Sequence, residues 1–233
     1  MKRKSQRQTI WLFDLDNTLH NASKAVFPAI ANNMTRYIAK VIANEQGEVD
    51  MEHVNHLRTE YLRRYGATLK GMVIHHGVKE EEFLREAHRF ENLEQLLHLE
   101  RGVARVLKTL PGKKILFTNA PQQYSKQVMR QLNLHKDFAG HISIETMRVH
   151  GKSHPKPSKA YLRKLLAQHG WHPRQCILVE DSVANLQAAK RIGLRTVMIT
   201  GHGQHVVQKS VTASADITVK SVFQLARLFK HKV

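Results

Sequence analysis

The sequence of 233 residues contains a single cysteine, Cys176. One cysteine cannot form an internal disulfide or a cysteine-rich metal site, so any metal would bind through oxygen or imidazole. This scarcity is typical of a chain that folds in a reducing compartment, and we expect a cytoplasmic location. The chain also has only 12 glycines and 6 prolines, which excludes a collagen-like or low-complexity protein.

Long hydrophobic runs are also missing. No apolar run approaches the roughly 18 to 20 residues that a transmembrane helix needs. The first run, Ile10 to Phe13, stops at Asp14 and is too short for the hydrophobic region of a signal peptide. Because 42% of the residues are hydrophobic and 24% are charged, the chain can bury a full core.

Acidic residues are scarce relative to basic ones. The chain has 37 Lys and Arg against 19 Asp and Glu, a net charge of +18 with histidine neutral. Such a charge attracts nucleic acid, an anionic membrane surface or a small phosphorylated substrate, because a positive field raises the local concentration of each. Charge alone does not choose among these partners.

Four short apolar runs each end in polar residues, and amphipathic patterns separate the later ones. The runs are Ile10 to Phe13, Lys114 to Phe117, Cys176 to Val179 and Thr196 to Ile199. Helical periodicity covers 103–110, 161–166 and 183–192. This alternation predicts an α/β protein with a doubly wound, Rossmann-like parallel sheet covered by helices on both faces.

Residues 20–100 interrupt the alternation. They contain helix-period runs, such as Met34 with Ile38 and Val54 with Leu57, and no convincing buried strand. We therefore predict a core formed by residues 1–19 and 101–233 and an inserted α-helical cap formed by residues 20–100.

Ligands of open α/β sheets bind at the carboxyl ends of the strands, where polar clusters follow the predicted strands. Asp14 and Asp16 follow the first strand and point to the same side of an extended chain. Two carboxylates at one site indicate a divalent cation, and Mg²⁺ accepts such ligands together with phosphate oxygens. An aspartate-rich turn that caps the next helix is the alternative.

Three more clusters follow in chain order. Thr118 and Asn119 end the second strand with a hydroxyl and an amide that can bind phosphate oxygens. Lys156 lies between two prolines and can neutralise a phosphate or a carboxylate, although most lysines are simply solvated. Glu180 and Asp181 end a later strand and can complete a metal site with Asp14.

In this order, the clusters resemble the motifs of the haloacid dehalogenase superfamily of aspartate-nucleophile phosphatases. Its pattern Asp-x-Asp-x-Thr matches Asp14 to Thr18, and its second-motif Thr or Ser matches Thr118. Its lysine matches Lys156, and its acidic pair matches Glu180 and Asp181. The matches span residues 10–200, and the insertion after the first motif is similar to the superfamily's helical cap.

The resemblance implies a Mg²⁺-dependent phosphomonoester hydrolase. Asp14 would be the nucleophile that forms an aspartyl-phosphate, and Asp16 would be the acid and base. Metal ligands would be Asp14, the backbone carbonyl of Asp16, and Asp181 helped by Glu180. Thr118, Asn119 and Lys156 would bind the phosphoryl group.

Three segments resemble the pyrimidine 5′-nucleotidase branch of the superfamily: FDLDNTLH (13–20), YGATLKG (65–71) and FTNA (117–120). They imply a pyrimidine nucleoside 5′-monophosphate as substrate. Phosphoglycolate, a sugar phosphate or a phosphomutase reaction remain alternatives, because related caps accept such substrates. Asp16 argues against dehalogenation, which needs no acid for a leaving alkoxide.

A nucleic-acid-binding protein on a phosphatase-like fold is the alternative of another class. It is motivated by the net charge and by a basic run in the expected cap, Arg58, Arg63, Arg64 and Lys70. The complete set of catalytic motifs favours the enzyme, and a basic surface also attracts a nucleotide substrate.

Overall fold

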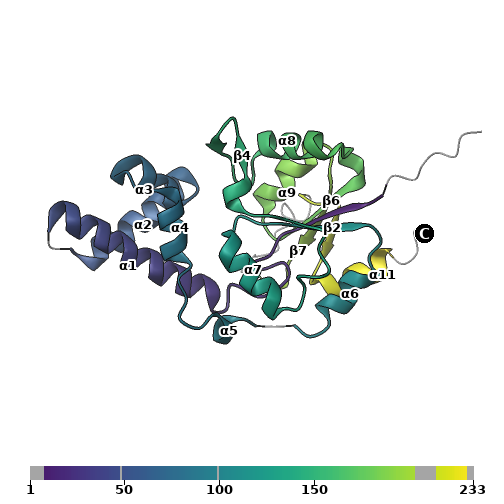
Figure 1. The fold of residues 1–233 in the computed structure, drawn as a ribbon, viewed down its shortest axis with the longest axis horizontal. Coiled ribbons are helices and arrows are strands. Elements are labelled where there is room, and N and C mark those ends of the chain that lie inside the picture. Colours follow the sequence, from purple (N-terminus) through teal and green to yellow (C-terminus); the bar gives the residue numbers. More distant parts are fainter. Residues whose placement is uncertain (1–7, 48, 99, 203–213, 230–233) are drawn as a thin grey trace, which may run out of the picture. The chain divides into compact units, whose positions relative to one another are not determined.

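The computed structural model describes residues 8–47, 49–98, 100–202 and 214–229. The chain forms two compact units, one of residues 1–23 and 97–233 and one of residues 24–96. We call them the core unit and the inserted unit (Figure 1). The inserted unit begins and ends inside the range 20–100 in which the sequence predicts a helical insertion.

One six-stranded sheet forms the centre of the core unit, in the order β3-β2-β1-β6-β7-β8 (Figure 1). All neighbouring strands are parallel. The strands are β1 (Ile10–Phe13), β2 (Lys113–Phe117), β3 (Gly140–Ile142), β6 (Cys176–Glu180), β7 (Arg195–Ile199) and β8 (Ile217–Val219). The predicted doubly wound parallel sheet is confirmed.

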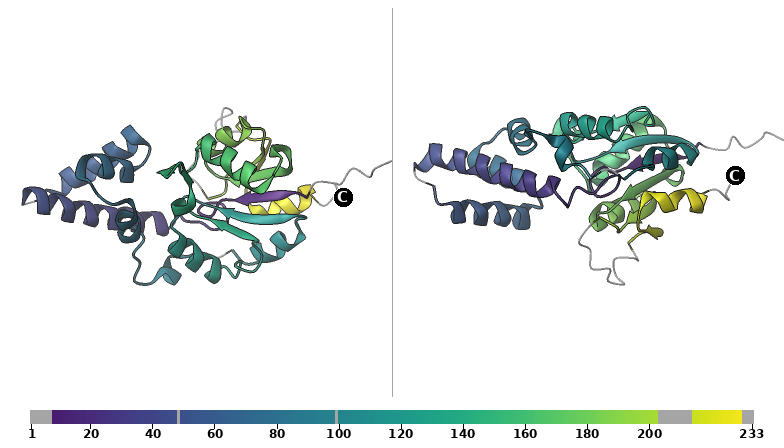
Figure 2. Two further views of the ribbon diagram at one scale, coloured as in Figure 1. Left: turned by 45° about the horizontal axis from the view of Figure 1, so that its top comes forward. Right: turned by 90° about the horizontal axis from the view of Figure 1, so that it is seen from below.

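Helices cover both faces of this sheet (Figures 1 and 2). One face carries α8 (Lys159–His169) and α9 (Val183–Lys190), and the other carries α6 (Val103–Thr109), α7 (Gln122–Gln131) and α11 (Leu225–Phe229). Leu12 packs in a cluster with Leu162 and Leu186 of the first pair. Because β1 is covered on both faces, all four of its residues are buried, which explains its continuous apolar run.

The sequence analysis assigned no helix to α7 or α11, and it also missed the shortest strands and turns. β3 and β8 each have three residues, and β4 (Arg148–Val149) pairs with β5 (Lys152–Ser153) in an antiparallel hairpin. Single turns of 3₁₀ helix cover Ile144–Thr146, Pro173–Gln175 and Val222–Gln224. None of these segments is long enough to show a period in its apolar residues.

The inserted unit consists of helices α1 (Val26–Gln46), α2 (Met51–Tyr65), α3 (Thr68–His76), α4 (Glu80–Ala87) and α5 (Leu93–Leu96). Asp50 caps α2 by accepting hydrogen bonds from the backbone N–H groups of Glu52 and His53. Gly66 ends α2 in the left-handed region. A Cβ atom at Gly71 of α3 would overlap the ring of Tyr61 in α2, so only glycine permits this close helix crossing.

In the described residues, no helix is both long and apolar enough to cross a bilayer.

Candidate active site

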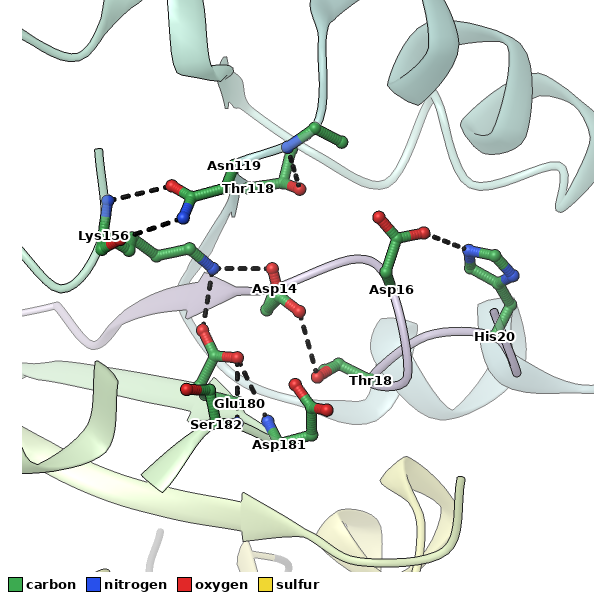
Figure 3. Close-up of polar contacts among 11 residues, drawn as sticks. Asp14, Asp16, Thr18, His20, Thr118, Asn119, Lys156, Glu180, Asp181 and Ser182 are labelled. Carbon is green, nitrogen blue, oxygen red and sulfur yellow. Dashed lines mark hydrogen bonds and ion pairs between the residues drawn. The ribbon is translucent and has the colours of Figure 1, made fainter. Parts of the chain in front are cut away.

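The motif residues of the core unit lie together at the carboxyl edge of the sheet (Figure 3). Asp14 follows β1, Thr118 follows β2, and Glu180 is the last residue of β6. β1 lies between β2 and β6, so parallel pairing brings these three strand ends side by side. The fourth motif, Lys156, reaches the same place from the loop before α8.

The ammonium group of Lys156 joins two of these acids. Its Nζ donates to Oδ1 of Asp14 at 2.6 Å and to Oε2 of Glu180 at 2.7 Å. All three side chains are at least nine-tenths buried. Burial alone would lower the pKa of Lys156, but Asp14 and Glu180 raise it above its usual value, so the ammonium stays charged. Lys156 is therefore a buried cation paired with two acids. It is not the solvated lysine that the sequence left as an alternative.

The acidic cluster holds more negative charge than this one lysine neutralises. Burial, followed by the charge of Glu180, raises the pKa of Asp14 to about 7 and that of Asp181 to about 9. Burial would also raise the pKa of Glu180, but the charge of Lys156, a hydrogen bond with the side chain of Asp181 and the backbone N–H of Ser182 lower it. Glu180 is therefore the most readily ionised of the three acids, whereas the raised pKa values of Asp14 and Asp181 favour their protonation when no other cation is present.

A divalent cation fits this excess of carboxylate. Asp14, Glu180 and Asp181 offer ligand oxygens that all lie within 4.8 Å of one another. A set of carboxylate oxygens suits the hard ion Mg²⁺. Glu180 already accepts hydrogen bonds on both of its oxygens, from Lys156 and from two backbone N–H groups, which leaves Asp14 and Asp181 better placed as side-chain ligands.

The side chain of Asp16 is directed to different partners. Its Oδ1 accepts a hydrogen bond from the hydroxyl of Tyr124 at 2.6 Å and lies 2.8 Å from Nε2 of His20. Tyr124 and His20 are both buried, at 2% and 0% exposure. The carboxylate of Asp16 is not part of the metal-binding cluster found in the described residues.

Asn119 has a contact that the sequence did not predict. Its side-chain amide donates to the backbone carbonyl of Lys156 at 3.0 Å, and its Oδ1 accepts from the backbone N–H of Lys156 at 2.9 Å. These reciprocal hydrogen bonds tie the strand end of β2 to the lysine loop. Thr118 is 1% exposed, and its hydroxyl oxygen accepts from the N–H of Ala120 at 3.0 Å, which leaves the hydroxyl hydrogen for an acceptor.

Sequence reasoning overlooked Tyr124. This residue lies in α7 just after the Thr118-Asn119 pair, and its hydroxyl is on the buried side of the helix. A buried hydroxyl needs a hydrogen-bond partner. A tyrosine on the apolar side of a helix next to a motif could therefore have indicated a contact with a polar residue of the site. His20, directly after the first motif, also contacts Asp16 through its Nε2.

Comparison with known proteins agrees with this arrangement. A family model for haloacid dehalogenase-like hydrolases matches residues 10–193, from the first strand to the end of α9. The chain belongs to this family. The match includes Asp14, Lys156 and Asp181, the residues around which the cluster is built.

Two curated proteins similar to this chain are named phosphoglycolate phosphatases. The protein of Pseudomonas aeruginosa is 24% identical over 217 residues, which cover 88% of this chain and 75% of the relative. The protein of Aliivibrio fischeri is 27% identical over 135 residues, which cover 55% of this chain and 57% of the relative. The comparisons support a phosphatase and do not confirm the pyrimidine nucleotidase branch.

Solved structures share the fold at low sequence identity. A phosphatase of the same superfamily from Thermococcus onnurineus has a TM-score of 0.65 at 17% identity, covering 96% of this chain and 98% of its own. An L-2-haloacid dehalogenase from Xanthobacter autotrophicus has a TM-score of 0.58 at 15% identity, covering 97% of this chain and all of its own. These similarities establish the fold alone.

Proposed function

We propose that this protein is a Mg²⁺-dependent phosphomonoester phosphatase that acts through an aspartyl-phosphate. The observation that carries the proposal is the contact of Asp14 with the buried ammonium of Lys156, which also binds Glu180, in a cluster that includes the carboxylate of Asp181. This site can concentrate positive charge around a carboxylate nucleophile and a phosphate. Mg²⁺ bound by Asp14 and Asp181 would supply the charge that offsets repulsion between carboxylate and phosphate.

In the first step, a carboxylate oxygen of Asp14 attacks phosphorus, and the bond from phosphorus to the ester oxygen breaks. The leaving alkoxide takes a proton from Asp16, which becomes a carboxylate. Lys156 contacts Asp14 directly and is close enough to balance the charge of the phosphoryl group. The hydroxyl of Thr118 donates to a phosphoryl oxygen, and Asn119 keeps the lysine loop in place.

In the second step, Asp16 removes a proton from water while the water oxygen attacks phosphorus. The bond between phosphorus and Asp14 breaks, inorganic phosphate leaves, and Asp16 is again protonated for the next cycle. The same carboxyl therefore gives and takes one proton per turnover. The contacts from Tyr124 and His20 orient it for both steps.

For the substrate, we place phosphoglycolate first, because two curated relatives carry that name. A pyrimidine nucleoside 5′-monophosphate is the second candidate, supported by the segments 13–20, 65–71 and 117–120 that resemble nucleotidases. Both substrates are small phosphomonoesters with an alkoxide leaving group, so the mechanism is the same for each.

The test is phosphate release from phosphoglycolate, UMP, CMP, AMP, GMP and sugar phosphates, with Mg²⁺ or EDTA. We expect turnover only with Mg²⁺, and its loss in Asp14→Asn, which keeps the size of the side chain. The substrate with the highest kcat/KM decides between the two candidates. Turnover that is unchanged in Asp14→Asn would contradict the mechanism, and isomerised sugar phosphate without free phosphate would indicate a mutase.

A further inference from the structure

The positive charge of the protein belongs to the core unit. The sequence of the inserted unit has ten Lys and Arg against eleven Asp and Glu, so its charges nearly cancel. The core unit has the other 27 Lys and Arg against eight Asp and Glu, a net charge of +19. The basic run from Arg58 to Lys70 is thus offset by acids of its own unit. An anionic partner drawn by the charge would meet the core unit.

One stretch of the core unit is almost free of acids. Between residues 146 and 215, the only acidic residues are Glu180 and Asp181, and both belong to the active-site cluster. This stretch forms the β4–β5 hairpin and the helices α8 and α9 on one face of the sheet. Four of its exposed cations, Lys152, Lys159, Arg163 and Arg174, have no ion pair among the described residues, whereas Lys190 pairs with Asp216 at 3.1 Å.

The hairpin and α8 hold three of these cations, Lys152, Lys159 and Arg163, on one continuous piece of structure. Lys159 and Arg163 are four residues apart in α8 and exposed, so they lie on the same side of the helix. Lys164 of α8 donates to the backbone carbonyl of Arg148 in the hairpin at 2.6 Å. This contact keeps the hairpin, with Lys152 on its second strand, against the helix.

Aromatic rings lie at the other end of α8. The rings of His169 and Trp171 stack with centroids 4.3 Å apart and planes 13° apart. His169 is exposed, and Trp171 lines an open hollow of about 510 Å³ together with His172 and Pro173. Ten residues of helix separate Lys159 from His169, which places the two side chains about 15 Å apart along the helix axis and about 80° apart around it.

We propose that this part of the core unit binds single-stranded nucleic acid. The α8 surface consists of Lys152, Lys159, Arg163, His169, Trp171 and Arg174. Its cations would contact phosphates, and a base would stack on the outer face of His169, because a basic track beside aromatic rings is the combination that binds single strands without sequence preference. This activity is separate from phosphate release and does not depend on it.

An anionic membrane is a poorer match for the same charges. Peripheral membrane binding combines basic residues with apolar side chains that enter the lipid. The large exposed apolar residues of the described chain are Phe27, Met51, Leu62, Val73 and Ile74 of the inserted unit and Leu228 of α11. None of them lies on the α8 surface.

The proposal is tested by fluorescence anisotropy of the full-length protein with a labelled single-stranded oligonucleotide of about 16 nucleotides. The double variant Lys159→Gln/Arg163→Gln should weaken binding about tenfold. It should also reduce the slope of log K against log salt by about 1.4 between about 50 and 200 mM, because two phosphate contacts are lost. The matched control is Lys126→Gln/Arg130→Gln.

This control removes the same two residue types at the same spacing, from α7 on the opposite face of the sheet. We expect it to change affinity less than about twofold. Equal weakening by the two double variants would overturn the proposal, because it would show a diffuse effect of net charge. Preferential binding to vesicles of phosphatidylcholine and phosphatidylserine over the oligonucleotide would also overturn it.

Stacking has its own test. His169→Ala should weaken binding about tenfold with an unchanged salt slope, because stacking involves no counterion release. Gln168→Ala, an exposed neighbour on α8, is the control and should have no effect. Full affinity in His169→Ala would overturn the assignment of the ring stack. Phosphate release should stay at the wild-type level in all these variants, so failure of this proposal is distinct from failure of the phosphatase.

Discussion

The hydroxyl of Tyr124 donates a hydrogen bond of 2.6 Å to Oδ1 of Asp16, although 108 residues separate them in the sequence. Nε2 of His20 lies 2.8 Å from the same oxygen. Burial and the charge of Asp16 raise the pKa of Tyr124 well above its usual value, so it stays a donor. One carboxylate oxygen has two lone pairs, and in the tautomer of His20 that carries its hydrogen on Nε2, two donors fill them. In the proposed mechanism, the transferred proton is therefore carried on Oδ2 of Asp16.

The effect of Tyr124→Phe on kcat/KM should depend on the leaving group of the substrate. An alkyl phosphate needs the proton of Asp16 when its alkoxide leaves, whereas acetyl phosphate releases a stable acetate. We expect kcat/KM to fall about tenfold for the alkyl substrate and less than about twofold for acetyl phosphate, since kcat/KM reports the first irreversible step. Steady-state kinetics measure both.

The control for this substitution is Tyr161→Phe, which removes the hydroxyl of another buried tyrosine in the core unit. It should leave both values of kcat/KM unchanged. Asp16→Asn should show the leaving-group pattern more strongly than Tyr124→Phe. An equal loss on both substrates in Tyr124→Phe would indicate general disruption and contradict the orienting role.

Lys156→Met should strongly destabilise the metal-free protein. The substitution leaves the carboxylates of Asp14 and Glu180 buried without their cation, and removal of one partner of a buried ion pair costs about 3–5 kcal/mol. Urea unfolding in EDTA measures this free energy. Adding Glu180→Gln should restore part of it, because one uncompensated charge is then removed.

Lys114→Met is the matched control for that measurement. Lys114 is also buried, but its Nζ donates to the backbone carbonyl of Leu110 at 2.8 Å and not to a carboxylate. We expect a smaller loss of about 1.5–3 kcal/mol, the net value of a hydrogen bond to a charged group. Equal losses in the two lysine variants would mean that the carboxylates around Lys156 carry little charge in the folded protein.

Stability without metal should decrease as pH rises. The pKa of Asp14 is raised from 3.8 to about 7 and that of Asp181 from 3.8 to about 9. The folded state therefore binds more protons than the unfolded state between about pH 4 and 9, and stability is lost as these protons leave. Thermal unfolding in EDTA across this range tests the direction.

Mg²⁺ should reverse the loss, most strongly at high pH, because it binds the deprotonated carboxylates. At a free concentration about 100 times its Kd, the ion should stabilise the fold by about 2.7 kcal/mol. Asp181→Asn should flatten the pH dependence and weaken the effect of Mg²⁺. A stabilisation by Mg²⁺ that is equal near pH 5 and near pH 9 would contradict binding at these acids.

Gly71→Ala should destabilise the inserted unit. In an ordinary helix interior, this change stabilises by about 1 kcal/mol, since alanine is the better helix former. Here the added Cβ atom would overlap the ring of Tyr61, and overpacking costs about 1–3 kcal/mol. Chemical unfolding, monitored by circular dichroism, measures whether the free energy of unfolding falls or rises. The double variant Gly71→Ala/Tyr61→Ala should lose less stability than the sum of the two single losses. Additive losses would contradict the clash.

Much of the core unit could be predicted from the sequence because its signals are local. The apolar run of β1 ending at Asp14 marks a buried strand, and the helical period of 161–166 marks α8. β3 was missed because three half-buried residues carry no period. The β4–β5 hairpin was missed because two residues a side cannot show alternation.

By itself, the sequence determined the four longest strands and three of the core helices, the motif residues at the strand ends and the net positive charge. It placed Asp14 and Glu180 at the ends of parallel strands and so predicted that they share a site, and the resemblance to the superfamily added Lys156. Only the tertiary structure decided that Lys156 joins two acids, that Asn119 clamps the lysine loop and that Tyr124 holds Asp16. These contacts depend on side-chain directions and distances between segments far apart in the chain, which no local pattern encodes.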